Sequence, residues 1–200
     1  MLTVLAIEPY GGGSHLAFLH GWADHSRHQI NSVTLPARHW KWRMRSAPLA
    51  MMGLLETAID PAKPPDLVMV SDMLDLPTWF GFASRHRRFR DWIGRVPLVT
   101  YFHENQWAYP TAINARVDHH YGYSNLLNAA MSDACWFNSE FNLTSFLEGS
   151  EAFLKRMPDC RDVPDLAMIR EKSTVIPPGF IPPCFSSSDA EPSAKDHPNK

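Results

Sequence analysis

The stretch "LTVLAIEPYGGGSH", residues 2–15, contains the pattern that decides the fold. Residues 2–7 form an apolar run without strict alternation, which is typical of a strand buried on both faces of a sheet. Three glycines then interrupt the chain, and apolar residues recur at helical spacing from Ser14, a residue type that often caps a helix N-terminus. A strand, a tight turn and a helix in this order predict the first unit of an α/β fold.

The same alternation continues along the chain. Further strands are predicted at residues 32–35, 66–71, 97–102, 133–138 and 173–176, and helices at about 48–58, 118–131 and 139–157. Apolar strands that alternate with helices imply right-handed crossovers, and therefore a Rossmann-like parallel sheet with helices on both faces. Such sheets bind ligands beyond the carboxyl ends of their strands, so we expect the site among the residues that directly follow each strand.

Composition sets the expected domain limits. With 200 residues, 44% of them hydrophobic, the chain can bury a substantial core, and we expect one Rossmann-like domain over residues 1–185. Residues 186–200 are polar and are expected to be a disordered tail or linker. No apolar run approaches the roughly 20 residues that cross a bilayer, and no signal-peptide pattern begins the chain, so a cytoplasmic location is expected. Three widely separated cysteines favour reduced thiols.

The glycine triplet is the first candidate binding element. Gly11, Gly12 and Gly13 lack the spacing of a dinucleotide fingerprint or a P-loop, which disfavours NAD and ATP. A turn at a helix N-terminus offers free amides that favour an anion or a hydroxyl-rich group. A purely structural turn is the competing interpretation. The flanking Glu8 and His15 favour function, because both are ionisable and would point into the same cleft.

Four consecutive polar residues, "HENQ" at 103–106, follow the predicted strand at 97–102. His103 could exchange a hydrogen bond with a substrate hydroxyl near neutral pH, and a buried, satisfied histidine is the alternative. Glu104 could accept a hydrogen bond, while Asn105 and Gln106 can each donate and accept. These groups suit sugars. No metal site is expected, because the ten histidines are scattered along the chain.

Two short stretches carry nine of the nineteen basic side chains. The second stretch contains five arginines between residues 85 and 95. In the first stretch, which lacks acids, tryptophans alternate with cations: its members are Arg38, Trp40, Lys41, Trp42, Arg43 and Arg45. Aromatic faces beside cationic groups are typical of single-stranded nucleic-acid binding. A solvated face with buried tryptophans is the competing interpretation.

Several motifs, taken in order, resemble the amino-terminal domain of the tRNA-queuosine alpha-mannosyltransferases, which are two-domain B-fold glycosyltransferases. The motifs are "IEPYGGGSH", "TLPARHWKWRMR", "YFHENQWAYP", "YGYSNLLNAAMSDACWFNSEFNLTSFL" and "VIPPGF", and the resemblance spans residues 2–183. It implies transfer of mannose from GDP-mannose, with retained configuration, to queuosine in a tRNA anticodon loop. It implies no metal and no permanently bound cofactor. It also implies a second, donor-binding domain in cis or trans, without which this half is expected to be inactive.

The resemblance also implies roles for individual residues. His103 would be the active-site histidine that contacts the transferred sugar, with Glu104 beside it. The glycine turn, with Ser14 and His15, would pack against donor phosphates or the acceptor. The remaining residues expected to bind substrate are Asn105, Gln106, Tyr109, Tyr123 and Ser139, and the first basic stretch would bind tRNA. The alternative function is a nucleic-acid or sugar-nucleotide binding module that has lost catalysis.

Overall fold

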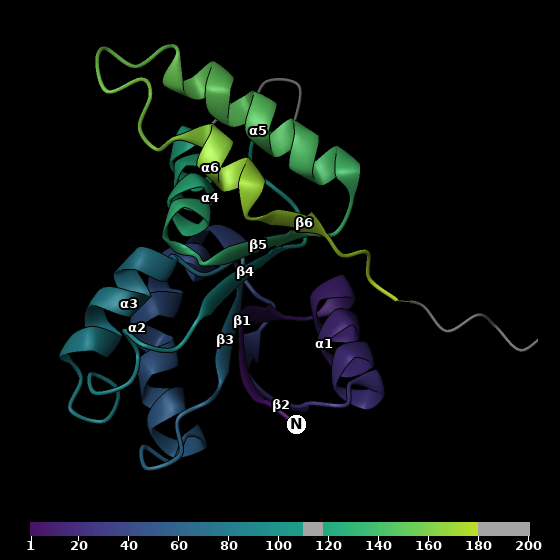
Figure 1. Ribbon diagram of the computed structural model, residues 1–200, viewed down its shortest axis with the longest axis vertical. Coiled ribbons are helices and arrows are strands. Elements are labelled where there is room, and N and C mark those ends of the chain that lie inside the picture. Colours follow the sequence, from purple (N-terminus) through teal and green to yellow (C-terminus); the bar gives the residue numbers. More distant parts are fainter. Residues whose placement is uncertain (110–117, 180–200) are drawn as a thin grey trace, which may run out of the picture.

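The computed structural model describes residues 1–109 and 118–179, which form one six-stranded sheet flanked by helices (Figure 1). All neighbouring strands are parallel, in the order β2-β1-β3-β4-β5-β6. The strands are β1 Thr3–Gly11, β2 Gln29–Pro36, β3 Leu67–Ser71, β4 Leu98–Phe102, β5 Ala134–Phe137 and β6 Ser173–Val175. The helices are α1 Gly13–His25, α2 Trp40–Ala58, α3 Leu76–Arg85, α4 His119–Met131, α5 Glu140–Leu154 and α6 Leu166–Glu171. The predicted Rossmann-like α/β class is confirmed.

Successive side chains of β1 are buried on opposite faces of the sheet. Leu5 and Ile7 belong to the core cluster formed with α2 and α3, whereas Val4 and Ala6 pack with Leu19 of α1. Figure 1 accordingly shows α1 on one face and α2 and α3 on the other. A further core cluster joins β4 and β5 to α4, α5 and α6. Burial on both faces explains why β1 begins with a continuous apolar run.

The strand order reverses at β1, and this reversal positions the candidate site. The chain passes from β1 to β2 on one side, then crosses back to add β3 and the later strands on the other side. Helix α1 therefore leaves β1 towards one face, while α3 leaves β3 towards the opposite face (Figure 1). In open parallel sheets such a switch point leaves a crevice at the carboxyl ends of the two strands.

The turn between β1 and α1 requires glycine at two positions. A Cβ on Gly12 would lie 2.5 Å from the Cβ of Ala37, and Gly13 has a φ of +53°. Gly12 is also the N-cap of α1, which has no side-chain cap. The prediction that Ser14 caps this helix is therefore wrong, because Ser14 is exposed in its first turn. Close packing and backbone geometry account for these glycines without a ligand.

Helix α2 begins earlier than the predicted boundary at about residue 48. It starts at Trp40 and contains Pro48 in its interior, although proline usually favours the first turn of a helix. Residues 40–45 of the first basic stretch thus lie on the opening turns of α2 rather than in a loop. Helices α3 and α6 were not predicted, although Asp75 accepts a hydrogen bond from the Thr78 N–H as an ordinary N-cap.

Two further predictions concern cysteines and chain ends. Cys135 and Cys160 form no disulfide within the described residues, and Cys184 lies outside them. The predicted domain limit at residue 185 and the predicted tail, 186–200, also lie outside the described residues. In the described part of the chain, no helix combines the length and apolar character that a bilayer span requires.

Candidate functional site

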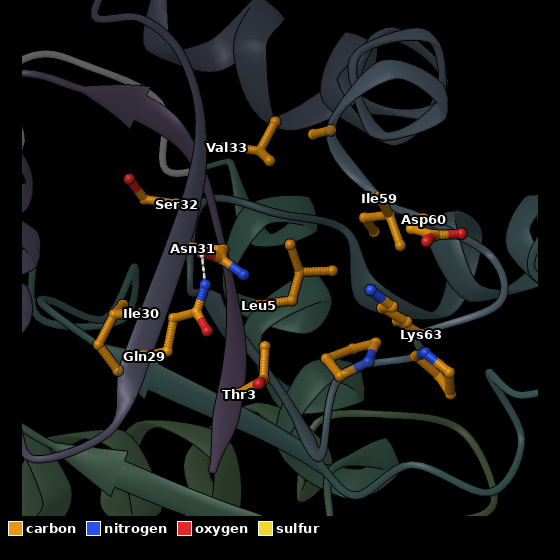
Figure 2. Close-up of a pocket in the computed structure, with 13 residues that line it drawn as sticks. Thr3, Leu5, Gln29, Ile30, Asn31, Ser32, Val33, Ile59, Asp60 and Lys63 are labelled. Atoms are coloured by element: carbon orange, nitrogen blue, oxygen red, sulfur yellow. Dashed lines mark hydrogen bonds between the residues drawn. The ribbon is translucent and has the colours of Figure 1, made fainter. Parts of the chain in front are cut away.

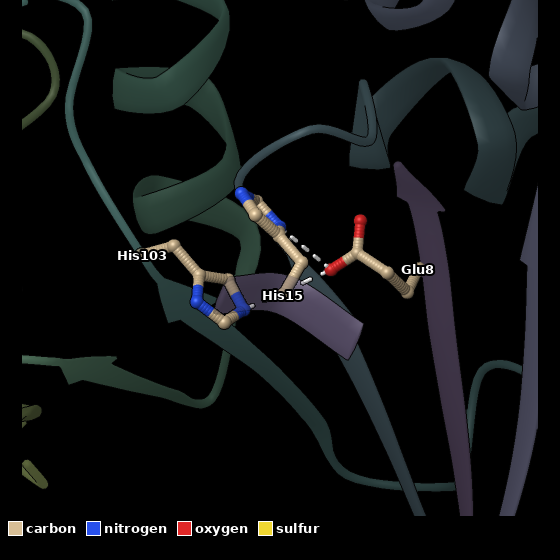
Figure 3. A group of neighbouring side chains, drawn as sticks. All are labelled: Glu8, His15 and His103. Atoms are coloured by element: carbon tan, nitrogen blue, oxygen red, sulfur yellow. Dashed lines mark hydrogen bonds and ion pairs between the residues drawn. The ribbon is translucent and has the colours of Figure 1, made fainter. Parts of the chain in front are cut away.

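Ionisable side chains from separate elements meet near the carboxyl ends of β1 and β4, where Glu8 and His15 are buried (Figure 3). Glu8 lies near the carboxyl end of β1, His15 in the first turn of α1, and His103 directly after β4. The Nδ1 atom of His15 lies 3.0 Å from Oε2 of Glu8, and the Nε2 atom of His103 lies 3.8 Å from the same oxygen. The other oxygen of Glu8 accepts the N–H of Tyr10 at 2.7 Å. Both carboxylate oxygens of Glu8 therefore make contacts within this corner of the site.

The two histidine rings lie against each other, with centroids 3.9 Å apart and planes inclined by 31°. The aromatic rings of Phe18 and Tyr101 pack against His103 at 5.3 and 4.7 Å. The backbone of His103 is fixed on both sides: its N–H donates to Oδ1 of Asp72 at 2.9 Å, and its carbonyl accepts from the side-chain amide of Asn138. The position of the His103 ring is therefore set before any substrate arrives.

Burial and neighbouring charges give the two histidines opposite protonation states. Burial, together with the charge of His15, lowers the pKa of His103 to about 3. Burial also opposes the charge on His15, but the hydrogen bond and charge of Glu8 outweigh it and raise the pKa of His15 to about 9. Burial raises the pKa of Asp72 to about 8 and that of Glu104 above its usual value. At neutral pH the corner thus holds a cationic His15 beside a neutral His103.

Glu8, His15 and His103 also offer three donor atoms within 4.8 Å of one another. Two imidazoles and a carboxylate form a donor set that zinc accepts in enzymes. The ion pair between Glu8 and His15 already satisfies these groups, so the arrangement is complete as an electrostatic cluster. The histidines are scattered along the sequence, but the fold brings two of them together.

A pocket of about 210 Å³ opens beside His103 and contains five predicted site residues: His103, Glu104, Asn105, Tyr109 and Ser139. Two of the five have structural tasks. The Asn105 side chain is buried, donates to Asn142 and Ser145, and accepts two backbone N–H groups of the following turn. Ser139 is the N-cap of α5, where its hydroxyl accepts the N–H of Asn142. His103, Glu104 and Tyr109 keep polar groups that can meet a substrate.

A larger cavity, of about 680 Å³, lies at the opposite edge of the sheet, beside the first residues of β1 and β2 (Figure 2). Gln29 and Asn31 line it and bond to each other at 3.3 Å, while Asp60 accepts the N–H of Ala62. Its lining has no counterpart to the coupled histidine pair. The chemistry therefore favours the carboxyl edge, where parallel sheets bind their ligands.

The sequence of residues 3–180 matches the family of tRNA-queuosine alpha-mannosyltransferase N-terminal domains. The chain belongs to this family. The tRNA-queuosine alpha-mannosyltransferase of Drosophila melanogaster is 31% identical over 161 residues, which cover 78% of this chain and 39% of that relative. The chain therefore spans well under half the length of this relative. Among solved structures, none matches the chain significantly.

In this mannosyltransferase-family domain, the loop that carries "HENQ" is anchored by Trp107. The indole packs closely against Gly122 of α4 and Gly149 of α5. A Cβ added to Gly122 would lie only 2.5 Å from the indole, so a larger residue would not fit there. Its Nε1 donates to the hydroxyl of Ser150 at 2.9 Å. The side chain of Gln106 donates to Glu104 at 3.4 Å. The loop thus has fixed attachments to two helices.

Tyr123, another predicted site residue, does not line the pocket beside His103. Its ring packs against Phe153 of α5 at 5.7 Å. Tyr121, which the sequence analysis did not select, instead lies beside Trp40 at 5.2 Å. Tyr121, Trp40 and Tyr10 share one cluster, and Tyr10 contacts the His15 ring at 5.8 Å. Tyr109, which lines the pocket beside His103, lies 5.7 Å from the Trp40 ring, so aromatic side chains join that pocket to the first turn of α2.

The first basic stretch lies beside these aromatic side chains. The Lys41 ammonium lies 5.5 Å from the Trp40 ring, and the Arg45 guanidinium 5.3 Å from the Tyr121 ring. Trp42 is 69% exposed. Arg43 is half-buried and donates to the carbonyl of Pro36, so it also supports the start of α2. Arg38 is exposed in the turn before the helix.

Proposed function

We propose that this chain is the acceptor-binding domain of a retaining glycosyltransferase that moves mannose from GDP-mannose to queuosine in a tRNA anticodon loop. Family membership supports the reaction class. The observation that carries the acceptor role is the contact of Tyr109 with Trp40, because it links a pocket suited to sugar hydroxyls with a surface suited to nucleic acid.

In the proposed reaction, the departing diphosphate takes the proton of the acceptor hydroxyl, and the mannosyl bond to phosphate is exchanged for a bond to that hydroxyl. Because the leaving group accepts the proton, no protein base is needed. The protein contributes orientation and charge stabilisation. The neutral ring of His103 could donate a hydrogen bond to a hydroxyl of the transferred sugar or accept one from it. A protonated ring could only donate.

His15 would stabilise the negative charge that develops on the leaving diphosphate. It is held as a cation by Glu8 and stands in the first turn of α1, where the helix dipole also favours an anion. Gly12 and Gly13 allow the backbone of this turn to approach a ligand closely. The donor nucleotide itself would be gripped by a second domain, so this chain alone should not transfer mannose.

The test uses the full-length protein with GDP-mannose and queuosine-containing tRNA, followed by nucleoside digestion and mass spectrometry. A product heavier by one mannosyl residue supports the proposal. His103→Ala should abolish transfer while leaving tRNA affinity nearly unchanged, and His20→Ala, at an exposed position of α1, is the matched control. Unchanged turnover in His103→Ala would refute the role of His103. Binding of tRNA without transfer by the unaltered protein would favour the non-catalytic module.

A further inference from the structure

The second basic stretch, residues 85–95, has no role in the proposed reaction and yet concentrates charge. It contains five arginines and one aspartate, for a net charge of +4. The first basic stretch, residues 38–45, also carries +4, whereas the whole chain carries −2. The remaining residues therefore carry −10. A net-acidic protein with two such islands presents a field that attracts polyanions at two places.

The backbone of the second stretch is anchored to the core, while most of its arginines are exposed. Phe89, Trp92 and Ile93 are buried in the core cluster beneath α2 and α3. His86 contacts Glu56 of α2 at 2.7 Å, and Arg88 donates to the carbonyl of Ile59 at 3.2 Å. With the backbone anchored in this way, four arginines are exposed to solvent: Arg85, Arg87, Arg90 and Arg95.

The two basic stretches mark the two ends of α2. The first stretch forms the opening turns of the helix, beside the carboxyl edge of the sheet and the histidine pair. The second stretch packs against the last turns of α2 and leads into the amino end of β4. A helix of 19 residues is about 28 Å long at a rise of about 1.5 Å per residue. An RNA contacting both ends must therefore extend well beyond the nucleotide at the site.

We infer that the exposed arginines of the second stretch bind the phosphate backbone of the acceptor RNA, at a part remote from the modified nucleoside. The inference rests on the proposed function for the identity of the RNA. Phosphate contacts position a nucleic acid without reading its sequence, and arginine is well suited to them. Within the described residues, Asp91 is paired with Arg90 at 3.4 Å between exposed side chains, and no other acidic side chain pairs with these arginines. The cations thus remain available to an incoming polyanion.

The test measures binding of the full-length protein to two RNAs over a range of salt concentrations. One probe is the intact queuosine-containing tRNA, and the other is a single-stranded oligonucleotide of its anticodon loop. The triple variant Arg85→Ala, Arg87→Ala, Arg90→Ala is compared with a matched control of three exposed arginines on the α5–α6 side, Arg156→Ala, Arg161→Ala, Arg170→Ala. A third variant, Lys41→Ala with Arg45→Ala, removes charge beside the site.

We expect the triple variant to lose about tenfold or more in affinity for intact tRNA, and the slope of log K against log salt to fall by about 2 to 3. Its affinity for the loop oligonucleotide should not change. The Lys41 and Arg45 variant should have lower affinity for both RNAs. The α5–α6 control should bind both RNAs as the unaltered protein does. An unaltered thermal midpoint checks that the triple variant is folded, as expected for exposed side chains.

Two results would overturn the inference, and a third would overturn the proposed function on which it rests. If the triple variant binds intact tRNA as the control does, while the unaltered enzyme transfers mannose, the second stretch has no RNA role and the proposed function stands. If affinity falls but the salt slope does not, the arginines do not neutralise phosphates, and the inference fails. If the unaltered protein neither binds nor modifies tRNA, the proposed function itself fails.

Discussion

Replacing Glu8 by glutamine should make the stability of the protein respond differently to pH. The substitution keeps the shape of the side chain but removes the charge that holds His15 protonated in a buried position. The pKa of His15 is raised from 6.5 to about 9. Since one pKa unit corresponds to about 1.4 kcal/mol, the shift contributes on the order of 3 kcal/mol to the free energy of unfolding.

The direction of the pH effect follows from the sign of the shift. A group whose pKa is higher in the folded state stabilises that state fully below its unfolded pKa, and this contribution is lost as pH rises through the folded pKa. Glu8→Gln should therefore be less stable than the unaltered protein by on the order of 3 kcal/mol at pH 6. The difference should shrink between pH 6.5 and 9. The charge of His15 lowers the pKa of Asp72 and that of Glu8 raises it, so the loss of both charges partly offsets in the titration of Asp72.

The assay is denaturant unfolding followed by circular dichroism at several pH values between about 6 and 9.5, the window set by the His15 shift. Glu56→Gln is the matched control, because Glu56 also pairs with a histidine, His86, at 2.7 Å but is 47% exposed. Exposed pairs contribute less than about 1 kcal/mol, so this control should change little. A stability loss in Glu8→Gln that is the same at every pH would refute the ion-pair account, because it would arise from packing or a neutral hydrogen bond.

Two further substitutions test features of the fold. Gly12→Ala should lower stability by about 1 to 3 kcal/mol in thermal unfolding, because the added Cβ would collide with Ala37, whereas Gly21→Ala in α1 meets open space and should stabilise the helix by up to about 1 kcal/mol; equal effects would argue against the close approach. Asn128→Ala should lower the denaturant midpoint by the equivalent of about 2 to 4 kcal/mol, because its amide bonds the backbone of Leu74 and Leu76 in the core; a change below about 0.5 kcal/mol would contradict that accounting.

The sheet and the edge that carries the site could be predicted because both depend on short local patterns. The apolar run at residues 2–7 predicts a strand buried on both faces, as Val4 to Ile7 are, and parallel strands must place His15 and "HENQ" at the same edge. The boundary of α2 could not be predicted from Pro48, because packing of Met44 and Met51 on either side overrides the preference of proline for a helix start.

The orientation of individual polar side chains could not be predicted in the same way. Asn105 turns into the protein because Asn142 and Ser145, nearly forty residues later, supply its partners. Tyr121 and Tyr123 are two residues apart on α4, so they point about 200° apart around the helix, and the first packs against Trp40 while the second packs against Phe153. A signal was available for Tyr121: it has the same helical face as the buried Asn125 and Asn128.

The wedge formed by Trp107 has a consequence for how the site works. Because the indole fills space that two helices leave open with glycines, the segment from His103 to Tyr109 is clamped before any ligand is present. A ligand therefore meets a finished wall on this side and loses little affinity to ordering it. Under the proposed function, the movement that admits a polynucleotide and then shields the transferred sugar is expected in other parts of the protein.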